Sequence, residues 1–198
     1  MWICVALTSI SGEDYKLPMS NFVYIGTSID GRISSSSGTL DWMETVPNPD
    51  GNDLGFFDFV ARVDAIVMGR VTFETIIEIG LGWHYPLPGI ILSSTMDTAP
   101  EGFAEHVQFA KGTPAEIVAL AKGQGFTNLY IDGGNTIQRF LRVDLIDELI
   151  ITELPILLGG GDRLFDTHDQ EMKFELLSSE VLLGQMVKRH YRRTRVEG

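Results

Sequence analysis

Short apolar runs alternate with amphipathic segments along the chain from residue 21 onward. This alternation is typical of strands and helices in α/β layer folds. The apolar runs predict six strands, at residues 22–25, 65–68, 90–92, 107–110, 129–131 and 148–154. Two further strand-like segments, at residues 174–180 and 185–193, predict a closing β-hairpin. No repeat and no linker divides the sequence, so we expect a single domain over residues 19–198.

Several helices are expected between these strands. Residues 54–62 place their apolar positions on one face by spacings of three and four. Thr113, Pro114 and Glu116 predict a sharp helix start, because a Thr cap, a first-turn Pro and a Glu three residues after the cap satisfy the free donors there. A third helix follows the fifth apolar run and carries an apolar face over residues 137–141.

The composition limits the classes of partner. The chain has 198 residues and a formal net charge of −12, from 15 Lys+Arg against 27 Asp+Glu. Nucleic acid and anionic membrane surfaces attract positive faces, so we expect neither as a partner. No apolar run reaches the roughly 18 residues of a spanning helix. Cys4 is the single cysteine, which excludes an internal disulfide and multi-cysteine metal sites and favours a cytoplasmic setting. The four histidines lack metal-ligand spacing, so no metal is expected.

Residues 1–18 have two interpretations. An apolar stretch at residues 2–7 is followed by charged residues and Pro18, directly before a second methionine, Met19. The segment is either an additional strand or arm, or an extension upstream of the usual start, and the sequence leaves both open.

Four of the predicted strands end next to residues suited to bind an anion. The carboxyl ends of parallel strands meet at one edge of a sheet, where a dinucleotide can cross them. Gly133 and Gly134 would offer backbone N–H groups at one helix start, and Thr72 a hydroxyl at another. Arg70 offers a forked donor for an additional phosphate, such as the one that distinguishes NADPH from NADH. The candidate cofactor-binding residues are Gly69, Arg70, Thr72, Ser93, Ser94, Lys111, Gly133, Gly134, Asn135 and Thr136.

Each of these features also has a plain structural interpretation. A Gly-Gly pair after a strand is often only a turn, and Ser93-Ser94 alone would serve as a loop cap. An Arg one residue past a strand is usually solvated. Their convergence on consecutive strand ends, with strand, small residue and helix in the same order twice, favours a cofactor site.

Three of these motifs resemble the cofactor motifs of dihydrofolate reductases. They are Met-Gly-Arg-Val-Thr-Phe-Glu at residues 68–74, Ile-Ile-Leu-Ser-Ser at 90–94 and Ile-Asp-Gly-Gly at 131–134. They are equally similar to the reductase domain of the bifunctional deaminase-reductase of riboflavin biosynthesis, which the Leu-Pro-Ile-Leu-Leu-Gly-Gly-Gly run at 154–161 also resembles.

This resemblance implies a three-layer α/β/α fold with a central mixed, mostly parallel sheet and a C-terminal β-hairpin. It implies NADPH as cofactor, with Arg70 and Ser94 at the adenosine 2′-phosphate. Thr72, Gly133 and Gly134 would then bind the pyrophosphate. The resemblance and the exposed closing strands also favour a homodimer.

On the substrate side, the resemblance points to an acid and its supporting threonine. Asp53, sixteen positions before Gly69, is similar to the acid that assists protonation in dihydrofolate reductases, and Thr152 to the threonine that supports that acid. A partly buried carboxyl beside a ring nitrogen can assist hydride addition to a C=N bond. Asp53 is equally well interpreted as a helix N-cap. The candidate substrate-binding residues are Ser28, Asp30, Trp42 and Phe57.

The sequence departs from the dihydrofolate reductase pattern in one place. Pro88-Gly89 runs directly into Ile90, so the Arg that binds the folate glutamate tail has no counterpart. The zinc-binding deaminase motif is also absent. We therefore predict a stand-alone NADPH-dependent reductase that acts on a small pyrimidine- or pterin-like molecule, first the phosphoribosylaminouracil of riboflavin synthesis and second dihydrofolate. The alternative, from a different functional class, is a protein that binds a dinucleotide but catalyses no reaction.

Overall fold

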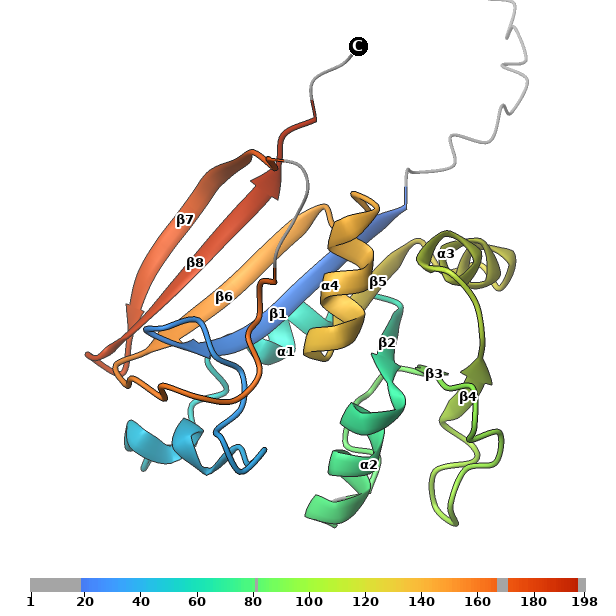
Figure 1. Cartoon of the computed structure of the whole chain (residues 1–198), viewed down its shortest axis with the longest axis horizontal. Coiled ribbons are helices and arrows are strands. Elements are labelled where there is room, and N and C mark those ends of the chain that lie inside the picture. The colour runs from blue at the N-terminus through green and yellow to red at the C-terminus, as the bar shows by residue number, and fades with distance from the viewer. Residues whose placement is uncertain (1–18, 81, 167–170, 196–198) are drawn as a thin grey trace, which may run out of the picture.

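The computed structural model describes residues 19–80, 82–166 and 171–195. Within these residues one eight-stranded sheet has the order β4-β3-β2-β5-β1-β6-β8-β7 (Figure 1). Neighbours from β4 to β6 pair in parallel, whereas β8 pairs antiparallel with both β6 and β7. The strands are β1 (Ser20–Ser28), β2 (Ala65–Gly69), β3 (Gly89–Leu92), β4 (Val107–Ala110), β5 (Asn128–Asp132), β6 (Glu148–Leu154), β7 (Phe174–Leu182) and β8 (Met186–Arg193). The two interpretations of residues 1–18 concern a segment outside the described residues.

Helices cover both faces of this sheet and make the three layers (Figure 1). Phe59 and Phe73, from α1 and α2, belong to the apolar core on one face, and Ile117 and Phe140, from α3 and α4, to the core on the other. The helices are α1 (Phe56–Val60), α2 (Arg70–Ile79), α3 (Pro114–Gly123), α4 (Gly134–Arg142) and the 3-10 helix η1 (Asp41–Thr45). The predicted three-layer fold with a mixed, mostly parallel sheet and a C-terminal hairpin is confirmed. In the described part of the chain, every helix is too short or too polar to cross a membrane.

The capping signal of α3 is confirmed in detail. The Thr113 side chain accepts a hydrogen bond from the Glu116 backbone N–H, and the Glu116 carboxylate accepts one from the Thr113 N–H at 2.7 Å. These hydrogen bonds to Thr113 lower the pKa of Glu116. A local sequence signal therefore sets this helix start without help from the rest of the chain.

The helix predicted over residues 54–62 was wrong in its length. It is one turn, α1, because Leu54 and Gly55 have φ angles of 58° and 86°, in the left-handed region that an α-helix cannot include. Phe57 therefore does not share a helical apolar face with Leu54, and 66% of its surface is exposed.

Two adjacent parallel strands, β2 and β5, lead almost directly into helices. Gly69 ends β2 and α2 begins at Arg70, while a single residue, Gly133, separates β5 from α4. Because the two strands are neighbours and run in the same direction, the starts of α2 and α4 come together at the carboxyl edge of the sheet.

Candidate functional site

A cavity of about 950 Å³ opens at this carboxyl edge. It is bounded by the start of α2, by the turn from β5 into α4, and by the carboxyl ends of β1 and β6. Nine of the predicted site residues line it: Asp53, Gly69, Arg70, Thr72, Gly133, Gly134, Asn135, Thr136 and Thr152. The structure thus brings together residues that are up to 99 positions apart in the sequence.

Two glycines of this cavity lie where an added side chain would clash with a neighbouring residue. Gly133 has a φ of +83°, and a Cβ added to it would lie 2.2 Å from the Thr72 hydroxyl oxygen. A Cβ added to Gly134 would lie 2.3 Å from the Cδ1 of Ile33. Neither α2 nor α4 has a side-chain cap among the described residues, so the backbone N–H groups of both first turns are available to a ligand. Such an arrangement suits an anion such as a diphosphate.

Arg70 lies at the start of α2 and lines the cavity. Its guanidinium donates to the Glu74 carboxylate one turn later, at 2.6 Å, and the Arg70 side chain is 42% exposed. This surface ion pair is weak, so a doubly charged phosphate can compete for the guanidinium.

The other adenosine-side candidates lie beyond the cavity lining. Ser93 and Ser94 follow β3, the neighbour of β2, and Lys111 follows β4, the edge strand beyond β3, on the same edge of the sheet. The buried Ser93 hydroxyl accepts hydrogen bonds from the N–H groups of Thr95 and Met96 at 3.1 and 2.7 Å. Ser93 therefore caps its own loop in this structure.

Asp53 lines the cavity but makes the contacts of a helix cap. Its carboxylate accepts hydrogen bonds from the N–H groups of Phe57 and Gly55, at 2.9 and 3.1 Å. These two bonds lower the pKa of Asp53, which therefore stays ionised at neutral pH. Thr152 is buried on β6 and also lines the cavity.

A second carboxyl group, that of Asp132, lies at the end of β5 in the same cavity. Burial raises its pKa from 3.8 to about 6, although hydrogen bonds with the Gly133 N–H and the Tyr130 hydroxyl act in the opposite direction. Tyr130 is buried beneath it and donates to the Tyr24 backbone oxygen at 2.9 Å. The charge of Asp132 also raises the pKa of Tyr85, after the larger effect of burial. Asp132 is thus an acid that keeps its proton to a higher pH than an ordinary aspartate, up to about pH 6.

Comparison with known proteins assigns the family. The family described as the RibD C-terminal domain matches residues 88–188. The chain belongs to this family. A solved structure from Shewanella sp. PV-4, titled a "Putative riboflavin biosynthesis protein", is 45% identical to it, with a TM-score of 0.86 over 89% of this chain and 100% of that one.

Two more distant structures share the fold. One is a diaminohydroxyphosphoribosylaminopyrimidine deaminase/5-amino-6-(5-phosphoribosylamino)uracil reductase from Thermotoga maritima, 14% identical, with a TM-score of 0.65 over 89% of this chain and 57% of that one. The other is a dihydrofolate reductase from Enterococcus faecalis complexed with NADP(H) and RAB-propyl, 21% identical, with a TM-score of 0.62 over 89% of this chain and 97% of that one. The predicted resemblance to this superfamily is confirmed.

The four candidate substrate residues are not gathered in the cavity. Ser28 donates to the Asp30 carboxylate at 2.7 Å, and Asp30 accepts from the N–H groups of Leu158 and Gly159. These bonds hold the pKa of Asp30 well below its usual range and tie the loop after β1 to the glycine run. Trp42 is buried in a small apolar cluster, and Phe57 is exposed to solvent. None of the four is among the residues that line the cavity.

Sequence reasoning missed Asp132 as a functional candidate. The residue belongs to the Ile-Asp-Gly-Gly motif, but only the glycines of that motif were assigned a role. An acid directly before a glycine pair at a strand end was the available signal. Its raised pKa has no local signature, because the burial that causes it comes from the fold.

Proposed function

We propose that this chain is an NADPH-dependent reductase that transfers a hydride to a pyrimidine- or pterin-like substrate. Membership in the RibD C-terminal domain family supports a pyrimidine reductase-like function. The observation that carries the proposal is the meeting of two uncapped helix starts and a partly buried acid in one cavity. The first candidate substrate is 5-amino-6-(5-phosphoribosylamino)uracil. A cytoplasmic homodimer is part of the proposal.

The residues at the carboxyl edge fit a dinucleotide. Gly133 and Gly134 leave room for a diphosphate against the α4 start, and Thr72 supplies a hydroxyl beside it. Asn135 and Thr136 belong to the first turn of the same helix. Arg70 would bind the 2′-phosphate, with Ser93, Ser94 and Lys111 further along the adenosine side. When bound, NADPH supplies the hydride.

Hydride addition to a C=N bond also needs a proton on the nitrogen. We assign this proton to Asp132, because among the described residues of the cavity it is the carboxyl whose pKa is raised, to about 6. The hydride forms the C–H bond, the Asp132 proton goes to the nitrogen, and solvent then reprotonates the carboxylate. Asp53 is the alternative donor, with Thr152 nearby on the cavity wall.

A dihydrofolate reductase activity is the second candidate. The short connection from Pro88 to β3 supplies no Arg to bind a folate tail, and a charge-assisted hydrogen bond of that kind contributes about 1.5–3 kcal/mol. We therefore expect folate substrates to bind weakly.

Two measurements test the proposal. Titrations of NADPH and NADH, followed by tryptophan emission, test binding, and the loss of NADPH absorbance with each candidate substrate tests turnover. We expect NADPH to bind in preference to NADH and to be oxidised fastest with the phosphoribosylaminouracil. NADPH binding without turnover on any candidate would favour a binding protein, and absence of binding would overturn the proposal.

The change Arg70→Ala tests the 2′-phosphate assignment. We expect it to weaken NADPH binding by about 10- to 100-fold and to leave NADH binding within about twofold, because only NADPH carries the extra phosphate. Arg142→Ala, which removes a comparably exposed Arg that does not line the cavity, is the matched control. Equal losses for the two cofactors would contradict the assignment.

A further inference from the structure

The loop between α2 and β3 carries three aromatic side chains in a row, those of Trp83, His84 and Tyr85. The Trp83 indole N–H donates to the Leu87 backbone oxygen at 2.8 Å, which closes the loop on itself. A Cβ added to Gly89, at the start of β3, would lie 2.6 Å from the Cη2 of Trp83, so the indole packs directly on that strand. Trp83 therefore anchors the loop and fixes the position of the residues that follow it.

The anchored loop brings Tyr85 to the carboxyl-edge cavity, which its side chain lines together with those of Tyr24 and Phe56. The ring centroids of Phe56 and Tyr85 are 6.2 Å apart, and those of Phe56 and Tyr24 are 5.7 Å apart, both in edge-to-face geometry. We call these three rings the aromatic wall. A flat ring packs favourably on such a wall, because aromatic rings attract one another in offset and edge-to-face arrangements.

The tyrosines that line this cavity differ in what their hydroxyl groups contact. The Tyr24 hydroxyl donates to the Leu54 backbone oxygen at 2.8 Å, and the Tyr130 hydroxyl to the Tyr24 backbone oxygen at 2.9 Å. The Tyr85 hydroxyl makes no hydrogen bond within the part of the chain that the structure describes. Since a tyrosine that is partly buried usually satisfies its hydroxyl, the Tyr85 hydroxyl is available to a ligand in the cavity.

Tyr85 also lies near Asp132, the carboxyl that we assign as proton donor. Burial raises the pKa of Tyr85, and the charge of Asp132 raises it further. The Tyr85 hydroxyl therefore keeps its proton at neutral pH and offers one hydrogen-bond donor as well as acceptor capacity. A ligand beside Asp132 thus meets a carboxyl and a phenol hydroxyl together.

The aromatic wall and the diphosphate position belong to different sides of the cavity. The three rings of the wall pack against the core cluster of Phe59 and Phe73, which α1 and α2 cover. Ile33, the neighbour of Gly134 at the α4 start, instead packs against the cluster on the other face of the sheet. The wall therefore suits the substrate rather than the diphosphate of the cofactor.

We propose that Tyr85 is a substrate-binding residue that selects a flat nitrogen heterocycle with a polar edge. The aromatic wall packs against the heterocycle, and the Tyr85 hydroxyl bonds a carbonyl or amino group on its edge. This role rests on the proposed function, because it specifies the ring system that the same site takes. An aromatic ring without polar edge groups would leave the Tyr85 hydroxyl and the Asp132 carboxyl unpaired, so it should bind less tightly.

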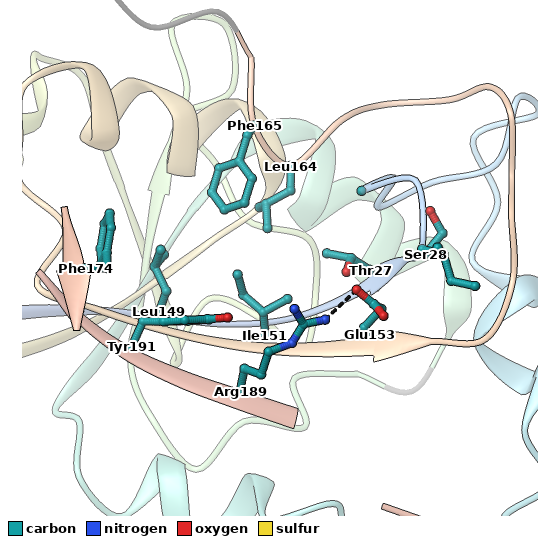
Figure 2. Close-up of a pocket in the computed structure, with 12 residues that line it drawn as sticks. Thr27, Ser28, Leu149, Ile151, Glu153, Leu164, Phe165, Phe174, Arg189 and Tyr191 are labelled. Carbon is teal, nitrogen blue, oxygen red and sulfur yellow. Dashed lines mark hydrogen bonds and ion pairs between the residues drawn. The ribbon is translucent and has the colours of Figure 1, made fainter. Parts of the chain in front are cut away.

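A second cavity, of about 330 Å³, supplies a matched control variant. Figure 2 shows Tyr191 of β8 in this cavity, beside Ile151 of β6. Thr152, the next residue of β6, lines the carboxyl-edge cavity instead. Because successive residues of a strand point to opposite faces of a sheet, Tyr191 lies across the sheet from the aromatic wall. Tyr191→Phe thus removes a tyrosine hydroxyl outside the proposed substrate site.

Calorimetric titration with 5,6-diaminouracil, a flat heterocycle with carbonyl and amino groups, tests the role of Tyr85. Tyr85→Phe keeps the ring and removes only the hydroxyl, so it should raise the Kd of diaminouracil about three- to tenfold, as expected for one hydrogen bond between uncharged groups. Tyr85→Leu also removes the aromatic ring and should raise the Kd by a further factor of about three or more. Tyr191→Phe should leave it unchanged, and the Kd of NADPH should stay the same in all three variants.

Separate measurements of binding and turnover distinguish the role of Tyr85 from the proposed reductase activity. Binding of diaminouracil that depends on Tyr85, without NADPH oxidation on any candidate substrate, would support the role of Tyr85 and contradict the reductase activity. Failure of the wild-type chain to bind diaminouracil, an unchanged Kd in Tyr85→Phe, or an equal loss in Tyr191→Phe would overturn the role of Tyr85. A larger loss for NADPH than for diaminouracil in Tyr85→Phe would also overturn it, because Tyr85 would then belong to the cofactor side.

Discussion

Gly133→Ala is expected to weaken NADPH binding by at least about 100-fold. The added Cβ would lie 2.2 Å from the Thr72 hydroxyl oxygen, so the β5–α4 turn or the α2 start must shift. The shift moves the N–H groups at the two helix starts that we assign to the diphosphate. Fluorescence titration with NADPH measures the loss directly.

Gly125→Ala is the matched control for this change. Gly125 has a φ of +91°, close to the +83° of Gly133, but a Cβ added to it meets nothing within 4 Å. Both substitutions place an L-residue at a positive φ, and only Gly133→Ala also carries the clash. If the two variants bind NADPH equally well, Gly133 does not form the diphosphate site.

Asp132→Asn is expected to lower the rate constant for turnover by about 100- to 1,000-fold, with little change in cofactor affinity. In the wild-type enzyme the carboxyl must be protonated, and its pKa is about 6, so turnover should fall as the pH rises above 6. The amide of asparagine does not titrate in this range, so this fall should be absent in the variant. A series of rate measurements between pH 5 and pH 8 gives both results.

Asp132→Asn, which should lower turnover, should increase the stability of the folded chain. The pKa of Asp132 is about 6 in the folded chain and near its ordinary 3.8 in the unfolded chain, so between these values the folded state binds more protons. Stability is therefore lost as the pH rises from about 4 to about 6, by on the order of 2 kcal/mol. Asp132→Asn should raise the melting temperature above that of the wild-type chain, and this increase should be larger at pH 7 than at pH 4.

Two further variants test whether the expected loss of turnover is specific to Asp132. Asp97→Asn, in a surface turn that does not line the carboxyl-edge cavity, is the control and should have wild-type turnover. Asp53→Asn compares the two candidate acids. If it removes the fall in turnover above pH 6 and Asp132→Asn does not, the proton donor is Asp53.

The sequence by itself determined the elements and their order. Buried strands such as Ala65–Gly69 and Gly89–Leu92 are continuous apolar runs, and local signals such as the Thr113 cap act over three residues. The strands that end at Gly69 and just before Gly133 predicted a shared edge, because parallel neighbours must end on the same side. Nine candidate residues consequently line one cavity.

Only the tertiary structure decided the pKa of Asp132, the length and cap of α1, and the pairing of β6, β8 and β7. Leu54 adopts a left-handed φ that shortens α1, and the Asp53 carboxylate caps that turn. The pKa of Asp132 is raised because the fold buries its carboxyl. The pairing of β8 with both β6 and β7 likewise depends on contacts between strands. Periodicity and capping are properties of neighbouring residues, whereas desolvation and the pairing of distant side chains exist only once segments remote in the sequence are in contact.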